Sequence, residues 1–293
     1  MASYRKILVA YDGSATARNA LAVASHLAKE DKSWIKVLTV LPNYEGDLEL
    51  IGVPNIKETI EGPAQKFLAE AREIADQEDV HILSNMAQGE PFNKIVHVAA
   101  DENCDLIVMG RRGTHQLERE LVGSVTARVI GYTQKDVLVV PDGARLTRKN
   151  ILLATDGSPS CETAVDRAIE LAAEHAAHLT ALSVVYTNDE YLALAPGIVE
   201  DLIAKAKAKL AVIAVKGREA GLDIKTLVKE GEAFEAITSY AQKNGIDLII
   251  MASHGRKGLP RVLMGSVTER TIGYTTCPVL VVHSITPPPE EYG

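Results

Sequence analysis

The feature of this sequence that most constrains its fold is a glycine pattern that occurs twice. The first copy, Gly-x2-Gly-x9-Gly-Ser, runs from Gly110 to Ser124, directly after the apolar run Leu106–Met109. The second copy follows the apolar run Leu248–Met251 with the same spacing, but Ala252 replaces its first glycine. A strand, a glycine loop and a helix start bring the backbone close to an anion and offer it N–H groups. We therefore interpret each copy as a phosphate-binding loop.

The rest of the chain is duplicated around these loops. The turn Asp12-Gly13-Ser14 returns 144 residues later at Asp156, whereas Gly123 returns 142 residues later at Gly265. In each half, apolar runs alternate with segments of helical periodicity. We expect strands over residues 6–11, 35–41, 81–87, 106–109 and 137–140, repeated over 150–155, 179–185, 224–228, 248–251 and 279–282. We expect helices over residues 17–29, 59–77, 91–102 and 124–132, repeated through 164–171 and over 199–220, 233–244 and 266–274.

This alternation predicts an α/β fold of two tandem, doubly wound domains, each with a five-stranded parallel sheet. We place the domains at residues 1–142 and 149–284, a linker at 143–148 and a flexible tail at 285–293. Ligands of doubly wound folds bind at the carboxyl ends of the strands, where the winding direction reverses. Asp12, after the first strand, and Gly110, after the fourth, are expected to meet there.

The composition argues against several classes of function. A net charge of −8 argues against a surface that holds nucleic acid or an anionic membrane. We see no apolar run long enough to span a bilayer and no signal peptide, so we expect a cytoplasmic protein. Cys104, Cys161 and Cys277 have neither metal-ligand spacing nor a disulfide framework. We expect Cys104 and Cys277 to be small buried residues, and Cys161, in the first turn of a helix, to be the one cysteine placed to form a thiolate.

The Asp-Gly-Ser turns, the glycine loops and the closing apolar strands together resemble the universal stress protein family in its tandem two-domain form. The resemblance covers essentially the whole chain apart from the tail. It implies a Rossmann-like α/β/α sandwich, similar to that of adenine nucleotide alpha-hydrolases, and a role in the cytoplasmic stress response. It also implies binding of ATP or AMP, with any Mg²⁺ held by the phosphates. Family members that lack the glycine motif bind no nucleotide.

Residue by residue, the resemblance implies that Asp12 and Asp156 accept the ribose hydroxyls and that the backbone near Val40 and Val184 reads adenine. The remaining contacts implied for the first site are Gly110, Arg111, Arg112, Gly113, Gly123, Ser124, Val125 and Thr126. Those implied for the second site are Ala252, His254, Gly255, Gly265, Ser266, Val267 and Thr268.

Several of these residues have ordinary structural alternatives. Asp12 or Ser14 could simply cap the following helix, Ser124 could be an N-cap, and the loop glycines could serve a tight turn. The arginines of the first loop and His254 could be solvated. If the first loop position requires a positive φ, Ala252 weakens the second site about tenfold, whereas at an ordinary φ the alanine is harmless. On that ground we expect the first site to bind more tightly.

We find no catalytic constellation in the sequence. A P-loop needs Lys after its last glycine, whereas Ser124-Val125 stand there. We can assemble no Ser-His-Asp order, carboxylate pair or zinc-like cluster, and we expect no metal ligand among the side chains. The sequence therefore favours a nucleotide-binding regulator over an enzyme. A nucleotide-free interaction scaffold and a slow ATPase are the alternatives.

The closing strand of each half would leave an apolar edge, which folded proteins do not normally expose. The resemblance implies that single-domain relatives dimerise through this strand. We therefore expect the two halves to pair within the chain and two chains to form a homodimer. The stress, the pathway and the protein partner cannot be read from the sequence.

Overall fold

The computed structural model describes residues 4–41, 43, 56–113, 122–187, 196–254 and 264–283. Gly255 of the second loop and the predicted tail lie outside these residues. Two compact units, residues 3–143 and residues 144–293, divide the chain and are described one at a time.

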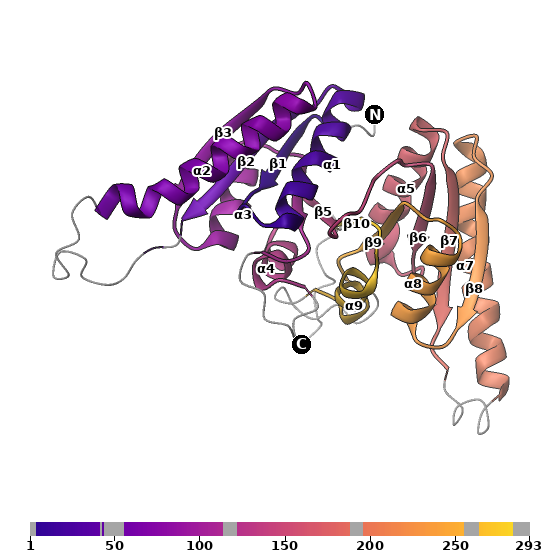
Figure 1. Ribbon diagram of the computed structural model, residues 1–293. Coiled ribbons are helices and arrows are strands. Elements are labelled where there is room, and N and C mark those ends of the chain that lie inside the picture. Colours follow the sequence, from indigo (N-terminus) through magenta and orange to yellow (C-terminus); the bar gives the residue numbers. More distant parts are fainter. Residues whose placement is uncertain are drawn as a thin grey trace. The chain divides into compact units, whose positions relative to one another are not determined.

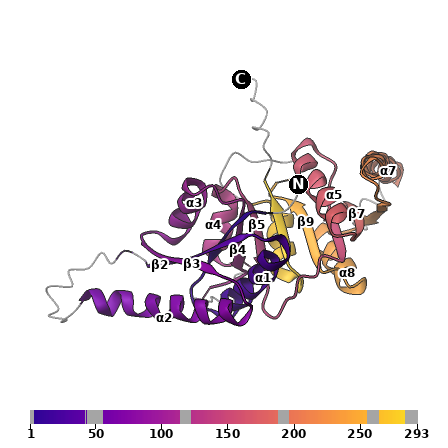
Figure 2. The same cartoon turned by 90° about the horizontal axis from the view of Figure 1, so that it is seen from above.

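The first unit is a parallel sheet with helices on both faces (Figure 1). Its elements are β1 (Lys6–Ala10), α1 (Ala15–Asp31), β2 (Trp34–Leu41), α2 (Ile56–Gln77), β3 (Ile82–Gln88), α3 (Pro91–Asp101), β4 (Leu106–Gly110), α4 (Ser124–Tyr132) and β5 (Asp136–Val140). The strands follow the order β3-β2-β1-β4-β5, and each pairs in parallel with its neighbours. Figure 2 shows α1 and α2 on one face of this sheet and α3 and α4 on the other. The winding direction therefore reverses between β1 and β4.

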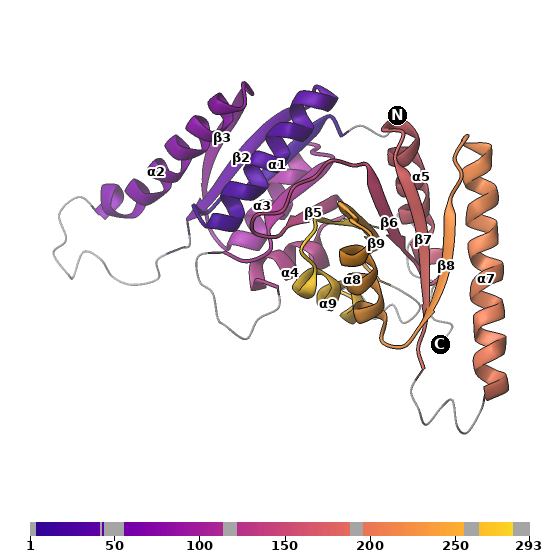
Figure 3. The ribbon, with the colours of Figure 1, turned by 45° about the vertical axis from the view of Figure 1, so that its right-hand side comes forward.

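The second unit repeats this plan. Its elements are β6 (Asn150–Ala154), the short 3-10 turn η2 (Pro159–Cys161), α5 (Glu162–Glu174), β7 (His178–Val185), α7 (Pro196–Glu219), β8 (Lys225–Glu230), α8 (Ala233–Lys243), β9 (Leu248–Ala252), α9 (Ser266–Tyr274) and β10 (Val279–Val282). The order is β8-β7-β6-β9-β10, again parallel. Figure 3 shows α7 alongside β7 and β8. The predicted α/β class with doubly wound parallel sheets is confirmed.

Most predicted element bounds differ from the structure by one or two residues, but two helices begin earlier. Helix α2 begins at Ile56 and α7 at Pro196, three residues before the predicted starts. Hydrophobic periodicity locates the body of a helix and does not mark its first residue. Proline is well tolerated in the first helical turn, where its missing N–H has no helical acceptor to lose. Among the described residues, every helix is too short or too polar to span a bilayer.

Aliphatic side chains fill the core of each unit, as the low aromatic content requires. The central strands carry side chains with no exposed surface: Ile7, Leu8, Val9, Ile107 and Val108 in the first unit, and Ile151, Leu152, Leu153, Ile249 and Ile250 in the second. Adjacent hydrophobic residues in one strand are typical of a parallel sheet covered on both faces. This packing fixes β1 beside β4 and β6 beside β9, and so positions the turns that follow them.

One buried charge distinguishes the first unit. The side chain of Lys36 on β2 is 8% exposed and forms an ion pair with Glu102, which also pairs with Lys6 at 3.2 Å. The hydrogen bond from Lys36, supported by the one from Lys6, lowers the pKa of Glu102. The second unit has Thr180 and Asn244 at the positions of Lys36 and Glu102.

This ion pair predicts a pH dependence of stability. Because the pKa of Glu102 is lower in the folded state, the pair stabilises the fold above the unfolded pKa of about 4.3, and this contribution is lost as the pH falls through the folded pKa. We expect Glu102→Gln to lower the free energy of unfolding at neutral pH and to flatten its decline in acid. Urea unfolding between about pH 3 and pH 7 measures both effects. Parallel pH profiles for the two proteins would contradict the expectation.

Candidate functional site

The turn after β1 presents Asp12 and begins α1. Ser14 is the N-cap of α1 and accepts a hydrogen bond from the Ala17 N–H at 3.2 Å. Oδ1 of Asp12 accepts from the Ser14 N–H at 3.0 Å. Gly13 has a φ of +73°, which glycine adopts without strain. Ser14 therefore caps α1, as the structural alternative stated. Asp12 does not cap the helix, and one of its two carboxylate oxygens accepts a hydrogen bond within the turn.

Gly110, the last residue of β4, packs directly against the start of α1. A Cβ at this position would lie 2.5 Å from Oγ1 of Thr16 and 2.8 Å from its backbone carbonyl carbon. Its φ is not in the positive range, so glycine is required here for close packing and not for a left-handed turn. The Thr16 hydroxyl donates to the backbone oxygen of Arg112 and ties the loop to α1.

Gly113 brings the glycine loop against the Asp-Gly-Ser turn. A Cβ at Gly113 would lie 2.5 Å from Oδ2 of Asp12, the oxygen that does not accept from Ser14. The two motifs are about a hundred residues apart in the sequence, yet the parallel pairing of β1 with β4 places them at the same edge of the sheet. The structure thus brings the glycine loop to Asp12 through Gly113, whereas Gly110, the residue named in the prediction, packs against Thr16.

The loop returns to the sheet at the start of α4. The Gly123 N–H donates to the Arg111 oxygen at 2.9 Å, and Gly123 is the N-cap, so Ser124 is the first helical residue and not a cap. Ser124 and Val125 lie in the first turn, where N–H groups have no helical acceptor. Thr126 is buried, and its hydroxyl donates to the Gly110 oxygen at 3.0 Å. Its side chain therefore joins α4 to β4, and only its N–H is left at the N-terminal end of the helix.

Two guanidinium groups follow Gly110. Burial, together with the charge of Arg112, lowers the pKa of Arg111. The buried Nε of Arg112 has no hydrogen-bond partner within the described part of the chain. A cation held next to another cation, and a buried donor without an acceptor, both favour an anionic ligand.

The backbone of Val40 faces the same edge of the sheet. The Tyr11 N–H donates to the Leu38 oxygen at 2.9 Å, and the Gly89 N–H donates to the Leu41 oxygen at 2.8 Å. Alternate residues of a strand direct their N–H and C=O groups to opposite neighbours, so Val40 faces the β1 side, as Leu38 does. Because β1 ends at Ala10, the polar groups of Val40 point past the end of that strand. Val184 occupies the same position relative to β6, since Thr155 donates to Leu182 at 2.9 Å.

Sequence reasoning missed a polar cluster beside Asp12. The Tyr11 hydroxyl donates to Oε2 of Glu70 at 2.8 Å, and Nε of Arg18 lies 2.5 Å from Oε1 of the same carboxylate. Burial and the bond to Glu70 raise the pKa of Tyr11, and the Arg18 hydrogen bond lowers that of Glu70. Glu70 comes from α2, and no local pattern marked it. The hydroxyl of Thr16, which recurs as Ser160 in the second half, was a signal in the sequence that we did not use.

The second site has the same frame with different side chains. Asp156 accepts from the Ser158 N–H at 2.8 Å, and the Gly265 N–H donates to the Ser253 oxygen at 3.0 Å. His254 stands where the first site has Arg112, and its Nδ1 lies 3.2 Å from the Ser253 hydroxyl. Further correspondences are Ser266 and Val267 at the start of α9, and the buried Thr268, whose hydroxyl donates to the Ala252 oxygen at 3.1 Å.

Ala252 does not have the strained backbone that we considered. Its φ is outside the positive range, so of the two alternatives the harmless one holds, and a Cβ does not strain the backbone here. The first site excludes a Cβ because Thr16 lies in the first turn of α1. In the second unit the corresponding residues form η2, and α5 begins only at Glu162. The second unit therefore has a different helix start and has an alanine, Ala252, at the position where the first unit has Gly110.

Cys161 also departs from expectation. It is the last residue of η2, it is 4% exposed, and its Sγ donates to Oδ1 of Asp156 at 3.3 Å. Burial, followed by the charge of Asp156, raises its pKa, so the thiol form is favoured and the predicted thiolate character is wrong. Cys104 and Cys277 are buried, as expected.

We still expect the first site to bind a phosphate-bearing ligand more tightly, now because it places Arg111 and Arg112 where the second site has Ser253 and His254. The full-length variants Asp12→Asn and Asp156→Asn each keep an oxygen for the turn and remove the charge of one site. Calorimetric titration with ATP should show the larger loss of affinity for Asp12→Asn. A larger loss for Asp156→Asn would reverse the ranking.

Comparison with known proteins agrees with this arrangement. The sequence model of the universal stress protein family matches residues 3–141 and again residues 147–283. Universal stress protein Slr1230 of Synechocystis is 28% identical over 302 residues, which cover 94% of this chain and 99% of that protein. A universal stress protein of Mycolicibacterium smegmatis is 30% identical, and the match spans 63% of this chain and 64% of that relative.

A solved structure shows the same fold over the full length. The universal stress protein from Archaeoglobus fulgidus superposes with a TM-score of 0.75 at 19% identity, covering 97% of this chain and 98% of that one. With both halves matched by the family and both sites built on the same frame, the chain belongs to the universal stress protein family.

Proposed function

We propose that each unit binds an adenine nucleotide, ATP or AMP, and that the chain is a cytoplasmic regulator of the stress response. The observation that carries the proposal is the position of Gly113 against Oδ2 of Asp12, 2.5 Å from where a Cβ would lie. Because Gly113 has no side chain, the loop can lie directly beside the Asp12 carboxylate. A sugar bound at Asp12 and a phosphate bound at the loop would then lie at the same edge of the sheet. The partnerless Nε of Arg112, noted above among the described residues, supports an anion there.

Each part of the nucleotide has matching groups. We assign the ribose hydroxyls to Asp12 and Asp156, which are acceptors, and the adenine edge to the backbone of Val40 and Val184. The phosphates are assigned to the glycine loops and to the first-turn N–H groups of α4 and α9, where the helix dipole favours negative charge. Any Mg²⁺ would be held by the phosphates.

We propose binding and not turnover as the main activity. In the described part of the first loop, the hydroxyls of Thr16 and Thr126 hold the backbone and Arg112 carries positive charge, so these three side chains would not act as a base for an attacking water. Slow ATP hydrolysis is the second candidate and would release phosphate. We further propose that the two halves act as the domains bounded at residues 1–142 and 149–284, that they pair within the chain, and that two chains form a homodimer.

The test is nucleotide analysis of the purified chain by acid extraction and chromatography, followed by calorimetric titration with ATP and Mg²⁺. The double variant Asp12→Asn, Asp156→Asn is the control. Binding in the natural chain that is lost in the control, without phosphate release, is the expected result. A chain that carries no nucleotide and does not respond to millimolar ATP would favour the nucleotide-free scaffold.

A further inference from the structure

Helix α7 has an exposed apolar face on the side away from its sheet. Its buried side chains Ala206, Leu210 and Ile213 belong to the side that packs on β7 and β8 (Figure 3). On the other side of the helix, Val212 is 69% exposed and Val215 is 46% exposed. Two aliphatic side chains this exposed and this close in the helix indicate a contact surface.

The exposed face has the spacing of a helix-pairing seam. Residues separated alternately by three and four positions lie along one line of a helix. On α7 this line, which we call the α7 stripe, consists of exposed residues only: Asp201, Ala204, Ala208, Ala211, Val215 and Arg218. The small alanines allow a second helix to approach closely. The stripe is acidic at its first residue and basic at its last, and neither of these two residues forms an ion pair within the described part of the chain.

The duplicated first unit is an internal reference for this stripe. Phe67 of α2 and Lys209 of α7 each lie against the glycine of an Asp-Gly-Ser turn, so the two helices correspond at a distance of 142 residues. Where α7 has Ala208, Val215 and Arg218, α2 has Lys66, Glu73 and Asp76. The fold therefore accepts a charged face at this place, and the apolar stripe of α7 is not a requirement of the architecture.

We propose that the α7 stripe binds the α7 stripe of a second copy of this chain, with the two helices antiparallel. This proposal rests on the homodimer proposed above and assigns a surface to it. A two-fold axis between residues 209 and 210 places Asp201 opposite Arg218 of the second copy, Ala204 opposite Val215, and Ala208 opposite Ala211. Each contact then occurs twice, as a two-fold interface requires. A parallel pair would instead place Asp201 against Asp201, so the charges select the antiparallel arrangement.

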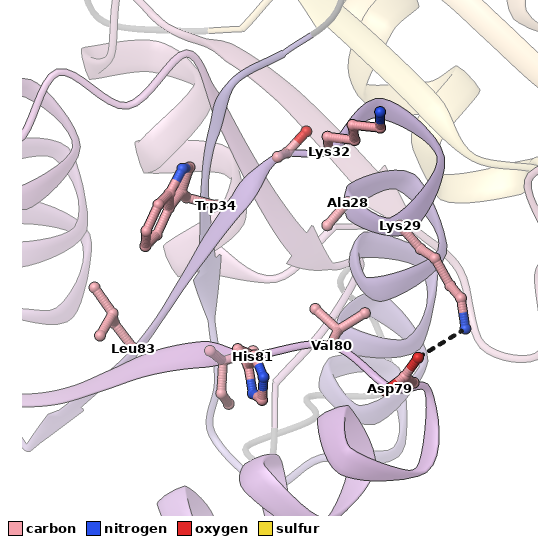
Figure 4. A pocket seen from close by; sticks show the side chains of 10 residues that line it. Ala28, Lys29, Lys32, Trp34, Asp79, Val80, His81 and Leu83 are labelled. Carbon is pink, nitrogen blue, oxygen red and sulfur yellow. Dashed lines mark ion pairs between the residues drawn. The ribbon is translucent and has the colours of Figure 1, made fainter.

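Another exposed apolar surface is a groove of about 440 Å³ in the first unit (Figure 4). Trp34 and Leu83 line it, and its Lys29 and Asp79 pair with each other at 3.8 Å. Because this pair is satisfied within the groove, it does not select a second copy as the occupant. Leu83, which is 58% exposed, therefore provides a control position for the loss of an apolar side chain elsewhere on the chain.

The experiment is sedimentation velocity of the full chain over micromolar concentrations at low ionic strength. Asp201→Arg alone and Arg218→Asp alone should each raise the dissociation constant of the dimer roughly tenfold, because each brings like charges together twice. The two substitutions combined in one chain should restore the natural value. An equimolar mixture of the two single variants should also associate, since each then supplies the charge that the other lacks. Val215→Glu should weaken the dimer at least as much, because it buries a carboxylate without a partner.

Two variants control for charge and for apolar surface. Asp76→Arg makes the same change of charge as Asp201→Arg, but on the exposed face of α2, and Leu83→Lys removes an exposed apolar side chain from the groove. Both should leave the dissociation constant unchanged. A dimer that no α7 variant weakens, a combined variant no better than the single ones, or a dimer lost in Leu83→Lys would overturn this surface and leave the homodimer standing. A natural chain that stays monomeric at every concentration would overturn both.

Discussion

Gly113→Ala is expected to weaken nucleotide binding at the first site while leaving the free energy of unfolding nearly unchanged. The new Cβ would lie 2.5 Å from Oδ2 of Asp12, so the carboxylate must turn away from the loop. A flexible side chain moves at little cost, and φ of Gly113 is outside the positive range, so alanine fits the backbone. Loss of hydrogen bonds to a charged acceptor costs about 1.5–3 kcal/mol, or roughly 10- to 150-fold in affinity.

The measurement is calorimetric titration with ATP in an Asp156→Asn background, so that the heat comes from the first site. Gly143→Ala is a control for the loss of a glycine, because nothing lies within 4 Å of a Cβ there, although its φ of +66° makes that alanine strained. The control should therefore lower stability and leave affinity unchanged, the reverse of the expected pattern for Gly113→Ala. Full affinity in Gly113→Ala would show that Asp12 does not contact the ligand.

Gly110→Ala is expected to lower the free energy of unfolding of the first unit, in contrast to Gly113→Ala, which mainly lowers affinity. Its Cβ would lie 2.8 Å from the backbone carbonyl carbon of Thr16, and a backbone atom cannot turn aside as a side-chain end can. Either β4 or the start of α1 must shift. Overpacking of this kind typically costs about 1–3 kcal/mol. Chemical denaturation should show the lower free energy of unfolding in the unfolding transition of the first unit.

The duplicated chain offers a matched control for this prediction. Ala252→Gly makes the reverse change at the corresponding position, where η2 replaces the first turn of the helix. It should cost only about 0.5–1 kcal/mol, from the greater freedom of glycine in the unfolded chain. If Gly110→Ala proved as mild as Ala252→Gly, the contact with Thr16 would not explain the glycine.

The comparison of the two loops shows how far local patterns reach. The alternation of apolar runs and helical segments predicted the sheets, because burial on both faces leaves a continuous apolar signature in each parallel strand. The repeat and the Asp-Gly-Ser turns predicted that Asp12 would meet the glycine loop, since strand ends on one edge converge whatever the side chains are. The starts of α2 and α7 were placed three residues late, because hydrophobic periodicity locates the body of a helix and not its first residue.

What the sequence by itself determined was therefore the family, the class of fold and the edge of the sheet at which the candidate site residues meet. Only the tertiary structure decided what each residue does there. It showed that Gly110 is needed to clear Thr16, that Ala252 is unstrained, that Thr126 joins α4 to β4, and that Cys161 is a buried thiol. Each of these outcomes depends on a contact between elements far apart in the chain, and the strength of such a contact is set by the distance between atoms, which local composition and spacing do not encode.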